Sequence, residues 1–130
     1  MKLSRTVAYA LQATLQLAQE GSDLPVPCSR LATEGKMPER FLLQILRNLV
    51  ARGILSSTRG VDGGYRLDRG ANEISLLEVI VAIDGPLTSS MPVSDGLTEE
   101  SRRKLEATLG EVATSVRSQL DTVKLADLLA

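Results

Sequence analysis

Residues 38–67 constrain the fold most, because they combine an amphipathic helix with a glycine-rich hairpin. Pro38 suits the start of a helix, and Gly53 suits the point where that helix ends. Between them, apolar residues recur at three- and four-residue spacing and predict one buried face: Phe41, Leu42, Ile45, Leu46 and Leu49. The opposite face is mostly cationic or amide-bearing and is expected to point outward: Arg40, Leu43, Gln44, Arg47 and Asn48.

The hairpin after this helix consists of two short strands around a turn that we place at residues 60–64. Tyr65 follows the turn, and an aromatic residue next to a glycine-rich turn is typical of hairpins. Arg59 before the turn and Arg66 after it are expected on a narrow ribbon that protrudes beside the cationic helix face. This combination predicts a winged helix-turn-helix that binds double-stranded DNA.

The charge distribution supports a polyanionic partner for the first half of the chain. Residues 1–70 contain 10 Lys or Arg and 6 Asp or Glu, a net charge of +4. Residues 71–130 contain 5 Lys or Arg and 10 Asp or Glu, a net charge of −5. The two halves add up to the net charge of −1 of the whole chain. A cationic half that includes the hairpin suits DNA, whereas the acidic half suits a surface that stays away from it.

Composition excludes several classes of protein. Hydrophobic residues make up 43% of the chain and aromatic residues only 2%, which indicates an aliphatic, mostly helical core. The chain shows no apolar run of about 18 residues and no signal-peptide layout, so we expect a soluble, cytoplasmic protein. Cys28 is the only cysteine and histidine is absent, which predicts no cofactor and no metal site made by the protein.

The residues before the amphipathic helix that begins at Pro38, here called the recognition helix, predict the rest of a helix-turn-helix. Ser4 is expected to cap a first helix, and Gly21 is expected to end it. Two prolines favour extended backbone at residues 24–27. Ser29 is then expected to cap a short helix at residues 30–34, which a turn connects to the amphipathic helix.

After the hairpin, residues 72–74 are expected to close the sheet, and Ser75 is expected to cap another helix. Gly85 and Pro86 should end that helix, and the polar composition of residues 87–96 predicts a mobile loop.

A long C-terminal helix is expected to start after Thr98 and to run to about Leu120. Its apolar residues are spaced by three or four, close to a coiled-coil seam: Leu105, Leu109, Val112, Val116 and Leu120. We expect this seam to pair with the same helix of a second copy, because DNA readers of this size commonly dimerise. Leu125, Leu128 and Leu129 predict a short terminal helix that packs across the dimer.

The expected fold class is therefore mainly α with a small β-hairpin wing. A winged helix-turn-helix domain occupies residues 1–85, a loop residues 86–97, and a dimerisation helix with a short terminal helix residues 98–130.

This pattern resembles the IscR/NsrR-type (BadM/Rrf-type) family of winged helix-turn-helix transcription regulators. The most specific match is Ser57-x-Arg59-Gly60-x-x-Gly63-Gly64-Tyr65-x-Leu67, preceded by Phe41-Leu42-x-Gln44-Ile45-Leu46. The resemblance implies a homodimer on a palindromic operator, with the recognition helix in the major groove and the wing arginine in the minor groove. We expect such a regulator to act as a repressor.

Individual residues of the recognition helix suggest how bases are read. Gln44 can form two hydrogen bonds with an adenine edge, whereas Arg40 and Arg47 could read guanine or hold phosphate. Leu43 stands where relatives often have a polar residue, and either contacts a thymine methyl or is simply an exposed leucine.

The wing residues divide into contact and structural candidates. Arg59 is the strongest candidate contact, because a narrow minor groove attracts an exposed arginine that has no packing role. Gly60, Gly63 and Gly64 are expected to supply positive φ angles at the turn. Tyr65 fits packing beneath the wing better than a DNA contact.

Many relatives place three cysteines before the long helix to hold an iron–sulfur cluster, but residues 87–100 contain none. We therefore expect a regulator without a cluster, which acts constitutively or responds to a small-molecule or protein effector. Cys28 is either a candidate redox thiol or a small buried residue, and only Arg30 is close enough in sequence to activate it.

Two other functional classes were compared with DNA-binding regulation. An enzyme is not expected, since the sequence offers no histidine and no phosphate-binding loop followed by a helix. A corepressor or other interaction module that keeps the fold without binding DNA is the alternative, which the basic first half and Arg59 disfavour.

Overall fold

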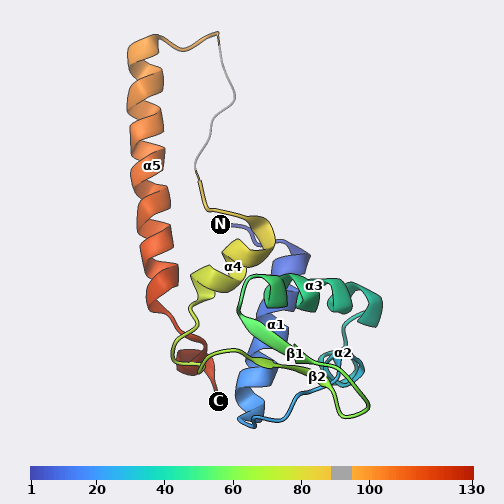
Figure 1. Ribbon diagram of the computed structural model, residues 1–130. Helices are drawn as coiled ribbons and strands as arrows, with labels where there is room; N and C mark the ends of the chain where they lie inside the picture. Colours follow the sequence, from blue (N-terminus) through green and yellow to red (C-terminus); the bar gives the residue numbers. More distant parts are fainter. Residues whose placement is uncertain (89–94) are drawn as a thin grey trace.

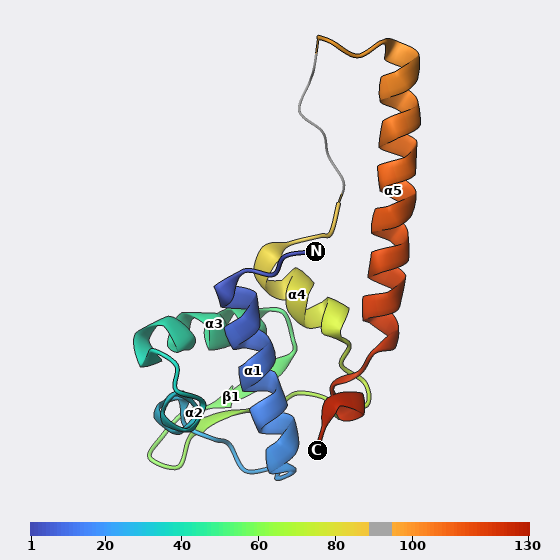
Figure 2. The same cartoon turned by 180° about the vertical axis from the view of Figure 1, so that it is seen from behind.

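The computed structural model describes residues 1–88 and 95–130, and most of the loop that we expected to be mobile lies outside them. Helices α1–α4 and the hairpin pack together, whereas α5 extends beyond them as a single long rod (Figures 1 and 2). In chain order the elements are α1 (Arg5–Glu20), α2 (Cys28–Gly35), α3 (Glu39–Ala51), β1 (Leu55–Thr58), β2 (Gly64–Leu67), α4 (Leu76–Asp84), α5 (Glu99–Thr122) and the 3-10 helix η1 (Leu125–Leu128). The predicted fold class, mainly α with a hairpin wing and a long C-terminal helix, is confirmed.

Helix α1 has the ends that its sequence predicts. The Ser4 hydroxyl accepts a hydrogen bond from the Val7 amide at 3.2 Å, and Gly21 ends the helix with a φ of 62°. Small residues on the buried face, Ala10 and Ala13, allow other helices to approach closely. Helix α1 consequently packs against α2, α3 and α4 and forms the centre of the domain.

Helix α2 begins earlier than predicted. Pro27, and not Ser29, is its N-cap, and the Pro27 carbonyl accepts hydrogen bonds from the amides of Arg30 and Leu31. The proline ring already holds a φ of −65°, so the chain enters the helix at Cys28 without a side-chain cap. At the other end, Lys36 adopts the left-handed conformation that glycine usually provides there.

Helix α3 buries four of the five residues predicted for its inner face: Leu42, Ile45, Leu46 and Leu49. The prediction for Phe41 was wrong, because this side chain is 57% exposed. Phe41 lies at the edge of the apolar stripe, and the four aliphatic residues already occupy the space between α3 and the core.

The hairpin is antiparallel, with a register that pairs Leu55 with Leu67 and Thr58 with Gly64. Residues 72–74 do not close this sheet as expected. Instead Val26 bridges to Tyr65, with both N–H···O bonds at 2.8 Å. The extended backbone around the two prolines presents the Val26 amide and carbonyl to β2, which attaches the wing to the segment before α2.

Helix α4 starts with the predicted cap, which is a complete capping box between Ser75 and Glu78. Val79 and Ile80 are buried, whereas the other apolar residues Leu76, Leu77 and Ile83 are only partly covered. Helix α4 packs against α1, α3 and α5 and so connects the long helix to the domain.

Helix α5 runs two residues beyond the predicted end at Leu120, and none of its residues is buried. The predicted short terminal helix is present as η1. Leu125 is 0% exposed within its own chain and does not require a second copy to cover it, whereas Leu128 is 48% exposed. The Leu125 amide donates to the Ile74 carbonyl at 2.9 Å, and the Ala126 amide donates to that of Ala71 at 3.0 Å. Among the described residues, no helix combines the length and apolarity needed to cross a bilayer.

Candidate nucleic-acid interface

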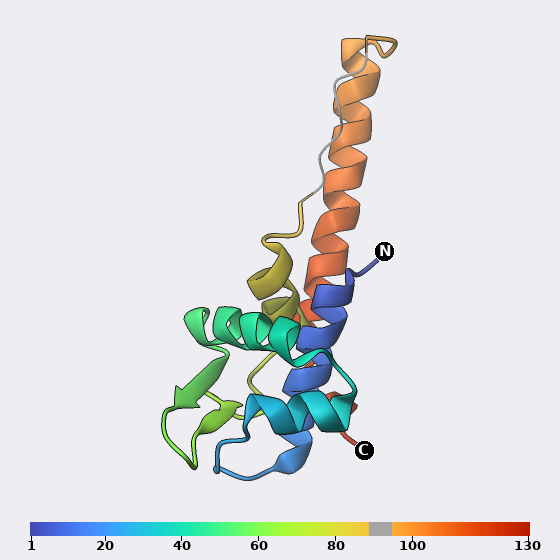
Figure 3. The same ribbon diagram turned by 90° about the vertical axis from the view of Figure 1, so that its right-hand side faces the viewer.

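The outer face of α3 carries the side chains predicted to read DNA. Arg40, Gln44 and Arg47 are exposed, and Leu43 is half-buried at the border of the same face. Because Leu42, Ile45 and Leu46 anchor the opposite side, this face is held in one orientation relative to the core. Figure 3 shows α3 crossing the domain with the hairpin below it.

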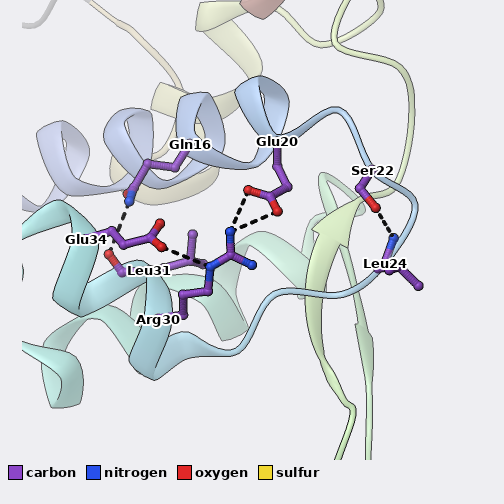
Figure 4. Close-up of polar contacts among 7 residues, drawn as sticks. All are labelled: Gln16, Glu20, Ser22, Leu24, Arg30, Leu31 and Glu34. Atoms are coloured by element: carbon purple, nitrogen blue, oxygen red, sulfur yellow. Dashed lines mark hydrogen bonds and ion pairs between the residues drawn. The ribbon is translucent and has the colours of Figure 1, made fainter.

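A row of polar side chains on α1 positions α2, the first helix of the helix-turn-helix (Figure 4). The Gln12 amide donates to the Gly35 carbonyl at 2.6 Å. The Gln16 amide donates to the Leu31 carbonyl at 3.2 Å, as Figure 4 shows. One turn further, Glu20 accepts hydrogen bonds from Arg30 at 2.8 and 2.9 Å. These contacts recur every four residues, so they lie on one face of α1 and hold α2 along its length.

The wing turn depends on three glycines for different reasons. Gly60 has a φ of 111° and Gly64 a φ of 153°, as predicted for the turn. Gly63 does not have a positive φ, so this part of the prediction was wrong. At Gly63 a Cβ atom would overlap the Thr58 carbonyl oxygen, and at Gly64 it would overlap the Val26 carbonyl. The close approach of two backbones therefore explains Gly63 and reinforces the requirement at Gly64.

Tyr65 has the packing role that its position in the strand favours. Its side chain is half-buried against the core, and its backbone carries both hydrogen bonds to Val26. Arg59 lies one residue beyond β1 and is exposed at the shoulder of the turn. The wing thus holds its arginine on a hairpin that is attached on one side to Val26.

A cleft of 500 Å³ between α3 and the wing brings two of the predicted contacts together. Arg47 lines it from α3 and Arg59 lines it from the wing, with the hydroxyls of Ser57 and Thr58 between them. No carboxylate is among its described lining residues, so the cleft suits an anion such as a DNA phosphate. The hydroxyls of Ser57 and Thr58, which line this cleft, were not singled out from the sequence, although hydroxyl side chains on a strand next to Arg59 were a usable signal.

Cys28 lines the same cleft but lacks the surroundings of a reactive thiol. Burial raises the pKa of the Cys28 thiol, and the nearby Glu39 carboxylate raises it further. The thiol lies 3.8 Å from the Glu39 carbonyl oxygen, to which it can donate. Arg30, the only cation near it in sequence, pairs with Glu20 and Glu34 instead. The geometry favours the protonated thiol.

The seam predicted for dimerisation is largely uncovered in the single chain. Leu105 and Val112 are exposed, whereas Leu109, Val116 and Leu120 are half-buried. Exposed aliphatic side chains at three- and four-residue spacing along a long helix are the usual mark of a surface that pairs with another helix.

The donor set of the chain does not fit an iron–sulfur cluster. Such clusters need several thiolates, or thiolates with histidines, and the sequence has one cysteine and no histidine. Within residues 1–88 and 95–130, no group of three His, Cys, Asp or Glu side chains is arranged to hold a metal ion.

The fold and the surface together define a winged helix-turn-helix DNA-binding regulator. The family model "Rrf2: Iron-dependent Transcriptional regulator" matches residues 3–130, and the chain belongs to this family. An HTH-type transcriptional regulator of Mycobacterium tuberculosis is 36% identical over 130 residues, which cover 98% of this chain and 81% of that protein. An rrf2-like regulator of Rhodobacter capsulatus is 31% identical over 138 residues, which cover 98% of this chain and 92% of that protein.

Solved structures agree with this assignment. CymR, the global cysteine regulator of B. subtilis, superposes with a TM-score of 0.82 at 26% identity over 98% of this chain and 95% of that one. T. potens IscR superposes with a TM-score of 0.78 at 27% identity, over 98% of this chain and 85% of that one. The predicted resemblance to IscR/NsrR-type regulators is therefore confirmed.

Proposed function

We propose that the protein is a cytoplasmic, non-catalytic repressor that binds a palindromic operator as a homodimer and carries no iron–sulfur cluster. The observation that supports this most is the cleft in which Arg47 of α3 and Arg59 of the wing converge without a lining carboxylate. An arginine from each element on one cleft suits a DNA backbone that passes between the major groove and the adjacent minor groove.

Base reading in this proposal comes from the exposed face of α3. Gln44 bonds an adenine edge, Arg40 contacts guanine or phosphate, and Leu43 contacts a thymine methyl from the border of that face. Gly60, Gly63, Gly64 and Tyr65 shape the wing that presents Arg59.

Dimerisation in this proposal uses α5. The seam of Leu105, Leu109, Val112, Val116 and Leu120 pairs with its copy, and residues 1–85 act as the DNA-binding unit. The packing of Leu125 against its own domain supports a rigid connection, because it fixes the C-terminal end of α5 to the DNA-binding unit.

The test begins with selection of a bound sequence from random duplexes, followed by fluorescence anisotropy at several salt concentrations. A DNA reader loses affinity linearly on a logarithmic salt scale, with a slope of about −0.9 per phosphate contact. Selection of no sequence, together with binding that does not respond to salt, would contradict the proposal and favour the corepressor module.

A further inference from the structure

A second cleft, of 380 Å³, has no described lining residue in common with the cleft between α3 and the wing. It is formed by the end of α1, the loop that follows, and the segment from β2 toward α4. Figure 4 shows part of one wall, where Glu20, Ser22 and Leu24 follow one another out of α1. Its volume falls within the range of small-molecule sites.

Charged side chains of both signs are available in this cleft. Arg66 and Asp23 line it, and neither forms an ion pair with any of the described residues. Glu20 and Arg69 also line it, but they are already engaged, Glu20 by Arg30 and Arg69 by Glu78. Asp68 lines the cleft as well; it forms no ion pair with any described residue and accepts a hydrogen bond from the Ser56 hydroxyl. Among the described residues, the cleft therefore offers one unpaired cation, Arg66, and two unpaired carboxylates, Asp23 and Asp68, to a ligand.

The remainder of the cleft adds apolar surface and a second attraction for positive charge. Leu17 and Val26 are buried at its base, and Leu24 at its edge is 73% exposed. The C-terminal end of α1 also contributes to the cleft, and backbone carbonyls at a helix C-terminus attract cations. A ligand can thus place a short apolar group against leucine and valine while its charged groups meet Arg66 and Asp23.

We propose that this cleft binds a small zwitterion of the amino-acid type, with its carboxylate on Arg66 and its ammonium group near Asp23. An arginine fork suits a carboxylate, because it can donate two parallel hydrogen bonds. A dianion would be repelled by Asp23, Asp68 and Glu20, and a polyamine would be repelled by Arg66 and Arg69. The mixed lining thus selects a ligand that carries one charge of each sign.

The cleft is connected to α2, to the wing and to the terminal helix, and a regulatory effect of the ligand rests on the proposed function. Glu20 contacts α2 through Arg30, and Val26 contacts the wing through Tyr65. Ala71 accepts a hydrogen bond from Ala126, which belongs to the terminal helix below α5. A ligand that bridges the two walls changes the relative freedom of α2 and the wing, and so changes operator affinity.

The binding test uses the full chain without DNA, so that its result does not depend on operator binding. The probes are the 20 standard L-amino acids at about 5 mM in thermal denaturation, because a ligand of the native state raises the midpoint. A probe that raises the midpoint is then titrated by calorimetry, next to its N-acetyl and methyl-ester derivatives, each of which lacks one charge. We expect both derivatives to bind at least tenfold more weakly.

Variants assign the site within the chain. Arg66→Gln and Asp23→Asn should each lower the affinity for the probe at least tenfold. Arg103→Gln, which removes an exposed charge on α5, should leave that affinity unchanged. If no amino acid raises the midpoint, or if both cleft variants bind the probe normally, the proposed site is wrong.

The regulatory part is measured on the selected operator. The bound probe should change operator affinity at least fivefold in the unmodified protein and should have no effect in Asp23→Asn, which keeps its affinity without the probe. Probe binding without a change in operator affinity would refute the regulatory role. Failure to bind any DNA would refute the proposed function and leave the calorimetric result for the cleft intact.

Discussion

Replacement of Gly64 by alanine should detach the wing from the segment before α2. A Cβ atom at this position would lie closer than 3.0 Å to the Val26 carbonyl group and 2.7 Å from the Pro27 nitrogen. These are backbone atoms, so they cannot move aside as the end of a flexible side chain could. Relief of the overlap requires separation of β2 from Val26, and this breaks the two hydrogen bonds between Val26 and Tyr65.

The expected loss of stability follows from the two broken hydrogen bonds and from the steric overlap that remains. Two hydrogen bonds contribute about 1–3 kcal/mol, and residual overlap in a packed site costs about 1–3 kcal/mol more. We therefore expect Gly64→Ala to lower the free energy of unfolding by about 2–6 kcal/mol in urea denaturation followed by circular dichroism. Hydrogen exchange of the Val26 and Tyr65 amides should accelerate in the same variant.

Gly60→Ala is the matched control, because Gly60 has a positive φ in the same turn but nothing within 4 Å of its Cβ position. It should show only the conformational penalty and should keep the Val26 and Tyr65 amides protected. Protection of both amides in Gly64→Ala would refute the reasoning, whatever the total loss of stability.

Four further predictions concern separate parts of the molecule. Lys36→Gly should stabilise the fold by about 1 kcal/mol in urea denaturation, since Lys36 has a φ of 54°. Arg59→Ala should weaken operator binding by about 1–3 kcal/mol in anisotropy without a change in circular dichroism. Leu109→Glu combined with Val116→Glu should give monomers in sedimentation, because paired seams cannot bury unpaired carboxylates. Burial raises the pKa of Glu78, but hydrogen bonds from Arg69 and Ser75 outweigh burial and lower that pKa below its ordinary value. The stability that results is present above about pH 4.3 and is lost as the pH falls through the pKa of the folded state. Glu78→Gln should therefore make the free energy of unfolding depend less on pH in this range, as measured by circular dichroism.

The elements with strong local signals could be predicted from the sequence. Ser4 and Gly21 mark the ends of α1, and Ser75 with Glu78 marks the start of α4. Each signal acts within four residues of the chain, so it does not depend on the tertiary fold. The same holds for the hairpin, where turn glycines lie between two short strands.

The errors arose where distant segments decide the outcome. Val26 joins β2 because the fold brings residues 26 and 65 together, and no local pattern encodes that distance. Phe41 fits the periodicity of a buried stripe, yet it is 57% exposed, while Leu42 and Leu46 on the same helix are fully buried. Leu125 was assigned to a dimer surface as part of a short apolar terminal helix, whereas a backbone hydrogen bond to Ile74 holds it against its own domain.

The candidate site was predictable as a list of residues but not as a geometry. Arg47 and Arg59 were both identified, but only the structure places them on one cleft with Cys28. The same geometry weighs against the thiol as the sensor, because Arg30 is drawn to Glu20 and cannot stabilise a thiolate.

The contacts that orient the DNA-binding elements contain no metal ligand, and this bears on how the protein can be regulated. Gln12 and Gln16 hold α2 through backbone carbonyls, and Val26 holds the wing through its own backbone. Groups of the protein itself make both links, to α2 and to the wing. In the proposed regulation, a ligand distinguishes two arrangements of these links. The cleft beside Glu20 and Val26 touches both, so ligand binding there can act on α2 and the wing together.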